Sequence, residues 1–302
     1  MNTIANTFLT NKAVNKWNLF WLISIPMSMI IAVVMSKHDM SNPEDISEMI
    51  GFSVRWAVPL IFIVTAASAV HTLHSNVFTR WWLRNRKYIG LCFAVAMAWQ
   101  GSFIFMISIM FRDYYFEDIY LLRNEIEGSI GYIFLATMVI TSFKSGSTYL
   151  NPQQWKLAHK AAVYFLWAYA YTVYWWQMFY YTKAVNGGVD PVMLDYIYYW
   201  AGFFAFALRI ASWGKIRQKR ITKKTNPLLL ISGSAIIAFG LIVAYTGTYW
   251  TESVNSYIMS PAWSVELELW LPFWSFEPFF SFFIIGLGVM LMTPLKTPIS
   301  TK

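Results

Sequence analysis

Eight apolar stretches alternate with short polar gaps along this 302-residue chain. Each stretch approaches the roughly 20 residues that a helix needs to cross about 30 Å of hydrocarbon. Backbone groups inside a bilayer must be hydrogen-bonded within the protein, so runs of this length are expected to be helices. We therefore predict an all-α integral membrane protein with eight transmembrane helices. The predicted spans are Trp17–Met35, Ile50–Leu73, Tyr88–Met110, Gly128–Phe143, Ala158–Tyr181, Val192–Trp213, Pro227–Tyr249 and Phe279–Met292.

Charged residues divide between alternate gaps. Of the 15 acidic residues, 14 lie in the first, third, fifth and seventh gaps, and Asp195 lies at the start of the sixth span, beside the fifth gap. Most of the 23 Lys and Arg residues lie in the terminal segments and the remaining gaps. Lys and Arg are retained preferentially in the cytoplasm, so both termini are predicted to be cytoplasmic. The predicted organisation is a cytoplasmic segment (1–16), a six-helix core (17–213), a basic cytoplasmic loop (214–226), and two additional helices (227–302) with an outer, Trp- and Glu-rich amphipathic segment (251–278).

The composition agrees with membrane insertion. At 57% hydrophobic and 13% charged residues, the chain is too apolar for an ordinary soluble domain. Its net charge of +8 is confined to short gaps between spans, which favours topology and contact with anionic lipid over binding of nucleic acid. Cys92 is the only cysteine, so neither an internal disulfide nor a thiolate metal site is expected. No Gly-rich phosphate loop or dinucleotide fingerprint occurs, so we expect neither a nucleotide nor a flavin cofactor.

A glycine stripe marks the seventh predicted span. Gly233, Gly240 and Gly247 recur every seven residues and so share one helix face. Small residues allow the backbones of two membrane helices to approach closely. The stripe therefore predicts close packing against a neighbouring helix and carries no chemistry of its own.

Three of the four histidines are predicted to lie at one depth on the cytoplasmic side. His71 and His74 close the second span, three residues apart and thus on one helix face, and His159 opens the fifth span. Such a pair facing a third histidine could ligate a b-type heme or a metal ion. The alternative is that these side chains hydrogen-bond to headgroups and loop carbonyls. No carboxylate lies mid-span, which argues against a proton-coupled transporter, and no catalytic residue is predicted.

Several short motifs then indicate a family. Their order and spacing matter more than any one of them: Arg55-Trp56-Ala57, the run Leu83 to Leu91 (LRNRKYIGL), Thr141-Ser142, and Trp155-Lys156-Leu157-Ala158-His159. The region from Arg55 to Trp175 resembles the ferric reductase-like transmembrane domain family, in particular the branch of the heme-binding membrane subunit of the bacterial periplasmic methionine-sulfoxide reductase system. The resemblance implies a six-helix core over spans one to six, heme b, electron transfer from quinol or a partner protein, and location in the bacterial cytoplasmic (inner) membrane.

The chain departs from the family at two ligand positions. Gln100 stands where the third span would carry a heme-ligating histidine, and Thr172 stands where the fifth span would carry its second. Only His159 matches a ligand position. Gln and Thr are poor heme ligands beside imidazole. The two-heme arrangement that the family implies across the membrane is therefore not expected here.

Two interpretations remain open. In the first, the protein is an oxidoreductase-family membrane subunit with a single cytoplasmic-side heme held by His159 and by His71 or His74. In the second, it is a heme-free membrane scaffold or partner-binding subunit that kept the fold and lost the heme ligands.

Overall fold

The structure is a computed structural model that describes residues 9–120, 122–182, 187–220, 226–258 and 277–294. Regular secondary structure in these ranges is helical throughout, which confirms the all-α prediction for the described residues. The chain divides into two compact units, and each is described by itself. The first unit comprises residues 1–67 and 76–168, and the second comprises residues 68–75 and 169–302.

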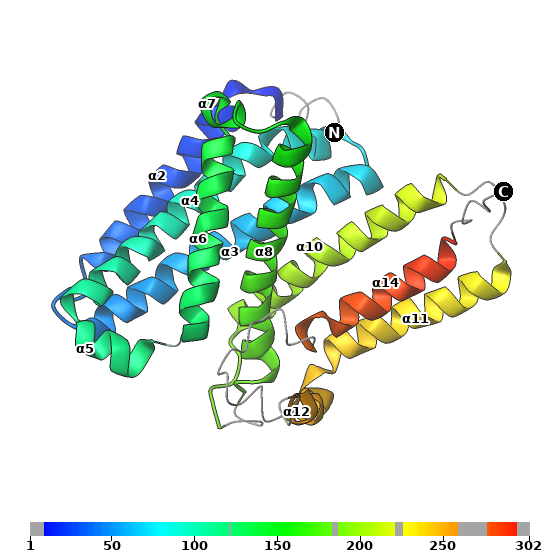
Figure 1. Cartoon of the computed structure of the whole chain (residues 1–302). Coiled ribbons are helices and arrows are strands. Elements are labelled where there is room, and N and C mark those ends of the chain that lie inside the picture. The colour runs from blue at the N-terminus through cyan, green and yellow to red at the C-terminus, as the bar shows by residue number, and fades with distance from the viewer. Residues whose placement is uncertain (1–8, 121, 183–186, 221–225, 259–276, 295–302) are drawn as a thin grey trace. The chain divides into compact units, whose positions relative to one another are not determined.

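The first unit is built from long helices joined by short turns (Figure 1). Its elements are η1 (Lys12–Val14), α2 (Lys16–Met35), most of α3 (Pro43–Leu73), α4 (Val77–Met110), α5 (Arg112–Tyr114), the π-helical turn η2 (Tyr115–Ile119), α6 (Leu122–Thr141), α7 (Lys144–Ser147) and the first part of α8 (Pro152–Phe179).

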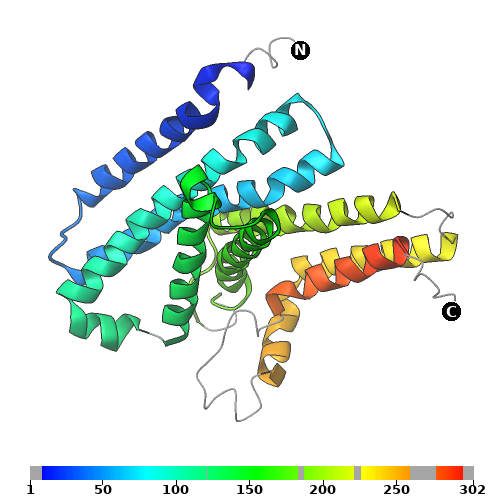
Figure 2. The same ribbon diagram turned by 45° about the horizontal axis from the view of Figure 1, so that its top comes forward.

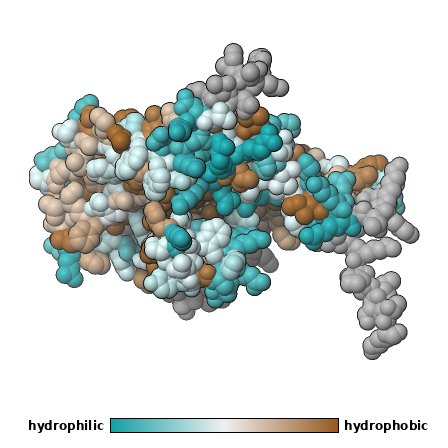
Figure 3. Space-filling model, turned by 90° about the horizontal axis from the view of Figure 1, so that it is seen from above, coloured by the Kyte–Doolittle hydropathy of each residue, from teal (hydrophilic) through white to brown (hydrophobic). Residues whose placement is uncertain are grey.

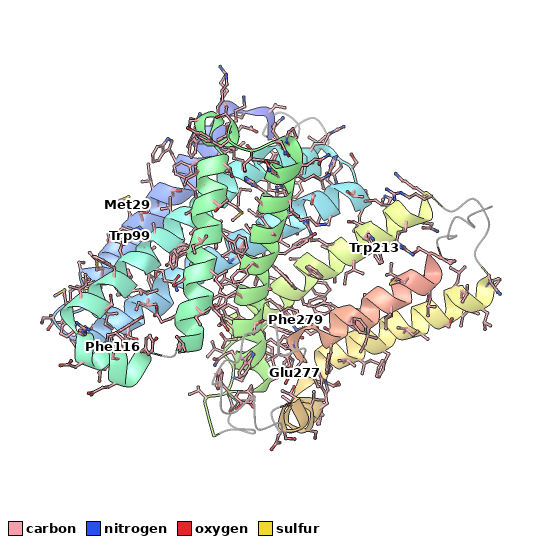
Figure 4. All side chains as sticks on the ribbon, in the orientation of Figure 1. Met29, Trp99, Phe116, Trp213, Glu277 and Phe279 are labelled. Atoms are coloured by element: carbon pink, nitrogen blue, oxygen red, sulfur yellow. The ribbon has the colours of Figure 1, made fainter. Side chains whose placement is uncertain are left out.

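Helix α2 packs along α4 in this unit (Figure 4). An apolar groove between them is lined by Met29 of α2 and Trp99 of α4, and the indole Nε1 of Trp99 donates a hydrogen bond to Ser28 Oγ at 3.1 Å. The buried side chains of Ile31 and Phe103 belong to the core of this unit. The packing follows the apolar faces of both helices.

Helix α4 begins earlier than the sequence predicted. The prediction placed the start of the third span at Tyr88, but α4 begins at Val77 because Asn76 and Thr79 form a capping box that satisfies the first backbone N–H groups. The basic residues before Tyr88, which were assigned to a gap between spans, are therefore helical. The basic residues and the apolar residues that follow them therefore belong to one continuous helix, so their relative directions around the helix axis are fixed.

The second unit contains the remaining helices. Its elements are the end of α8, α10 (Met193–Gln218), α11 (Pro227–Tyr245), α12 (Gly247–Ile258), η3 (Glu277–Phe279) and α14 (Phe280–Met292). Helices α11 and α14 lie side by side in both ribbon views (Figures 1 and 2). On α10, Arg217 stacks over the ring of Trp213, with its guanidinium carbon 4.7 Å from the ring centroid (Figure 4).

The glycine stripe packs as predicted. A Cβ on Gly233 would lie 2.7 Å from the backbone oxygen of Gly288 on α14, and one on Gly240 would lie 2.7 Å from Ile285 Cγ1. Higher numbers on α11 face lower numbers on α14, so the two helices are antiparallel. Gly247 meets the ring of Phe179, where a Cβ would lie 2.5 Å from Cγ. The predicted close approach of a neighbouring helix is thus confirmed at Gly233 and Gly240, whereas Gly247 lies beyond the end of α11 and makes its close contact with α8.

Among the described residues, four helices are long and apolar enough to cross a membrane: α2, α3, α4 and α11. The fourth, fifth and sixth predicted spans overlap α6, α8 and α10, and the eighth coincides with the short α14. A multi-pass helical architecture is therefore supported, while the number of eight spans stays a prediction.

The seventh predicted span is wrong at its end. It was extended to Tyr249, but α11 ends at Tyr245, and Thr246 separates it from α12. The backbone N–H of Thr246 still bonds to Ile242 O, and the tight contact of Gly247 with Phe179 fixes the position of the turn. A side chain at residue 247 would prevent that contact.

The predicted amphipathic segment 251–278 is described only at its two ends. Residues 259–276, which include Trp263, Trp270, Trp274, Glu266 and Glu268, lie outside the described residues. Its first residues are part of α12. Glu277, at its end, is 2% exposed, so this carboxyl group is buried rather than on the surface (Figure 4).

Candidate functional site

His159 lies in the first unit, about two turns after the start of α8, and contacts Thr141 and Trp155. Its Nε2 is 2.7 Å from the hydroxyl oxygen of Thr141 at the end of α6. The ring of Trp155, one turn earlier on α8, stacks on the imidazole with a centroid distance of 4.1 Å. The Trp155 indole Nε1 also donates to the backbone oxygen of Thr141 at 3.0 Å. His159 therefore joins the end of α6 to the start of α8.

The Thr141 hydroxyl contacts two groups at the end of α6. Its oxygen lies 2.6 Å from the backbone oxygen of Thr137 and 2.7 Å from His159 Nε2. A hydroxyl has one hydrogen to donate, so it either donates to Thr137 and accepts from an Nε2–H of His159, or donates to an unprotonated Nε2. In both arrangements Nε2 is engaged by Thr141.

A cavity of about 340 Å³ adjoins His159 within the first unit. Four helices line it. Its polar lining residues are Arg84, Arg86, Lys87, Ser142, Trp155 and His159. Its remaining lining residues are apolar side chains and one glycine: Ile61, Val64, Leu83, Gly90, Leu91, Phe93, Leu135, Met138, Val139 and Val163. No Asp or Glu is among the lining residues, so the cavity carries basic groups without an acidic side chain of its own.

Two of the basic side chains are oriented by neutral oxygen atoms. Arg84 donates to Asn15 Oδ1 at 2.7 Å, and the Lys87 ammonium donates to the backbone oxygen of Ser142. Asn85 is fully buried, and its side-chain amide donates to the same Asn15 oxygen at 3.0 Å. These bonds fix the position of the cationic groups. They leave the positive charges of Arg84 and Lys87 without compensation from those partners.

The structure places the other two predicted ligands in the second unit. His71 lies in the last turn of α3, and His74 lies one residue beyond its end, with an exposed side chain. The prediction that both share one helix face is therefore wrong, because α3 ends at Leu73 and only the backbone N–H of His74 still bonds to Val70 O. Neither compact unit by itself brings His159 together with His71 or His74. Across the described ranges, no group of three or more His, Cys, Asp or Glu side chains is placed to hold a metal ion.

The structure also describes the two positions that the resemblance assigns to lost ligands. In the first unit, the phenol of Tyr132 lies 3.3 Å from Gln100 Oε1, and a Cβ on Gly101 would lie 3.1 Å from the same phenol oxygen. In the second unit, Thr172 is buried. The space beside Gln100 is thus occupied by the Tyr132 side chain.

The sequence analysis did not predict that Arg84, Arg86 and Lys87 line a cavity, because it treated them as a topology signal and as part of a family motif. Their spacing carried a further indication: positions 84 and 87 share a helix face with Leu91, so cations and apolar side chains follow each other along one face. Recognising this needed the true start of α4. It also needed the knowledge that α6 and α8 close the cavity.

Comparisons of the chain with protein-family models, with curated proteins and with solved structures find no match.

Replacement of Thr141 by Val is expected to destabilise the protein by about 1–3 kcal/mol, because Nε2 of the half-buried His159 loses its hydrogen-bond partner. The matched control is Thr137→Val on the same helix, since the Thr137 hydroxyl bonds only to the backbone oxygen of Ile133. We expect that control to cost less than about 1 kcal/mol. Thermal unfolding in mild detergent would measure both. Equal destabilisation by the two substitutions would contradict the assigned role of the Thr141–His159 bond.

Proposed function

We propose that this protein is a heme-free, multi-pass subunit of the bacterial cytoplasmic membrane, with a ferric reductase-like fold that serves binding instead of heme-mediated electron transfer. Eight spans with both termini in the cytoplasm are part of this proposal. The segregation of acidic and basic residues into alternate gaps supports that topology. The four long apolar helices agree with it.

The hydrogen bonding of His159 carries the heme-free part of the proposal. Axial ligation of iron by this imidazole through Nε2 would require loss of its hydrogen bond to Thr141. The stacked Trp155 covers one face of the ring. The contacts of the imidazole with Thr141 and Trp155 thus support a structural role for His159, in which it links α6 to α8.

The former ligand position on α4 supports the same conclusion. Gln100 is hydrogen-bonded by Tyr132, whose phenol is also 3.1 Å from the backbone oxygen of Met97. A histidine and a heme at this level would need the space that the Tyr132 side chain occupies. The substitution of the ligand is thus accompanied by a side chain that fills the site, as expected when a cofactor site is given up.

The competing interpretation is a single cytoplasmic-side heme held by His159 and by His71 or His74, with electrons from quinol or a partner protein. It predicts a chromophore that depends on His159. The two interpretations therefore differ in a single spectrum.

We expect a flat reduced-minus-oxidised absorption spectrum from detergent-purified protein expressed with ample heme. The same preparation of His159→Ala should give the same flat spectrum, and His38→Ala, in the gap between α2 and α3, serves as the matched control. A Soret shift with α and β bands that is lost in His159→Ala and kept in His38→Ala would establish the heme interpretation instead.

A further inference from the structure

We propose that the cavity beside His159 binds the phosphate headgroup and upper chain of an anionic phospholipid. This proposal deepens the binding role proposed above and rests on the cavity being free of heme. Nothing in the family resemblance assigns such a ligand to this site.

The charge of the cavity is one-sided. Arg84, Arg86 and Lys87 line it, and none of the lining residues is acidic. The partners that orient Arg84 and Lys87 are an amide oxygen and a backbone carbonyl, both neutral. Arg84 and Lys87 are exposed and Arg86 is half-buried, so the three cations are accessible to an anionic group at the mouth of the cavity. Basic pockets between membrane helices on the cytoplasmic side are suited to anionic lipid headgroups.

Polarity changes in one direction along three of the lining helices. On α6, Ser142 follows the end of the helix and Leu135 lies nearly two turns deeper, and on α8, Trp155 lies near the start and Val163 two turns deeper. On α4, the basic residues precede Phe93 in the same way. The cavity therefore has a cationic end and an apolar end. This is the pattern of an amphiphile with an anionic head.

The cationic end lies where the first unit has other polar residues. Figure 3 looks onto the end of the molecule at which α7 lies in Figure 1, and hydrophilic side chains gather on this face. Trp155 lines the cavity at this end. Indole rings favour the level of lipid headgroups, so this residue suits contact with a glycerol or phosphate group.

The size of the cavity limits what enters it. A volume of about 340 Å³ lies near the lower end of the range of about 300–1,000 Å³ that is typical of ligand pockets. It accommodates a phosphate headgroup and the first part of one chain, but not both chains of a phospholipid. We infer that the rest of the lipid stays in the bilayer.

Binding is tested by native mass spectrometry of the full chain in detergent, titrated with phosphatidylglycerol or with phosphatidylcholine. Because the two lipids share chain length and phosphate but differ in net charge, we expect retention of phosphatidylglycerol at least about tenfold stronger. This comparison uses the unaltered protein and needs no variant. Equal retention of the two lipids would overturn the proposal.

The site is then tested by paired charge removals. Arg86→Gln with Lys87→Gln is expected to weaken phosphatidylglycerol binding about tenfold or more. The matched control removes two cations from exposed positions on α8 that do not line the cavity, Lys156→Gln with Lys160→Gln, and should change binding less than about threefold. If both pairs of substitutions weakened phosphatidylglycerol binding equally, the lipid would be held by the general positive charge of the protein surface, and the assignment of the cavity as its binding site would be wrong.

Free phosphate is the other source of the same chemistry. Val163→Phe fills the apolar end without changing charge, so it should weaken lipid binding while leaving any effect of inorganic phosphate on thermal stability unchanged. If inorganic phosphate displaces the lipid at low millimolar concentration and Val163→Phe has no effect on lipid binding, the site binds phosphate alone and the lipid proposal fails. A heme spectrum would refute the proposed function separately, and lack of lipid retention with a flat spectrum would refute only this inference.

Discussion

Gly288→Leu is expected to disrupt the α11–α14 pair and to cause the largest loss of stability of any substitution discussed for this protein. A Cβ at residue 288 would lie 2.6 Å from the backbone oxygen of Gly233 and 2.7 Å from Ile237 Cγ1. The reverse contact is equally tight, because a Cβ on Gly233 would lie 2.7 Å from Gly288 O. Backbone atoms cannot move aside as a flexible side chain can, so the two helices must separate.

The expected cost exceeds the roughly 1–3 kcal/mol that is typical of an overpacked core, because separation also removes the other contacts of the pair. These include Ser281 and Ile285, which pack against Gly240. We expect little folded protein after purification in mild detergent, or a melting temperature lowered by many degrees. Size-exclusion chromatography followed by thermal unfolding would measure both effects.

Gly286→Leu provides the matched control for this experiment. Gly286 lies two residues earlier on α14, and no atom lies within 4 Å of a Cβ built there. The same change of residue type and helix propensity is thus made on a face that is open. If the two variants were equally stable, close packing of α11 on α14 would not hold the second unit together.

Features that depend on one helix could be predicted from the sequence. The helical segments follow from runs of apolar residues, and the seven-residue glycine spacing indicated a tight interface before its partner was known. Helix ends were less accurate. The early start of α4 depends on reciprocal bonds between Asn76 and Thr79, and the end of α11 depends on a contact of Gly247 with Phe179, which is distant in sequence.

The candidate site could be predicted only in part, because it depends on which helices meet. His159 was identified from its motif, but the Thr141 hydroxyl that holds its imidazole lies on α6, and their contact has no sequence signature. The Tyr132 phenol beside Gln100 is another contact of this kind. His74 was placed on a helix face because period alone does not show that α3 ends at Leu73. The candidate site is formed by contacts between side chains on different helices, and the residue pattern of a single helix does not show which helices meet.

Tyr199→Ala is expected to destabilise the second unit by about 3–5 kcal/mol, the usual cost of truncating a buried aromatic residue. Tyr199 on α10 is fully buried, and its ring lies 5.6 Å from Tyr171 and 5.2 Å from Phe179. Its phenol donates to the backbone oxygen of Ala244 near the end of α11 at 2.6 Å. One side chain thus joins α8, α10 and α11, and its removal leaves a cavity that three helices border.

Two further variants separate the ring from its hydroxyl. Tyr199→Phe keeps the ring packing and loses the interactions of the hydroxyl with Ala244 and with the Tyr171 side chain, so we expect a cost of about 1 kcal/mol. Tyr196→Ala, one turn earlier on α10 with a side chain that is 44% exposed, should cost less than about 1 kcal/mol. Thermal unfolding of the three proteins in one detergent gives the ranking Tyr199→Ala, Tyr199→Phe, Tyr196→Ala, in order of decreasing effect. If Tyr199→Phe were as damaging as Tyr199→Ala, the interactions of the hydroxyl would be the dominant contribution and the aromatic packing a minor one.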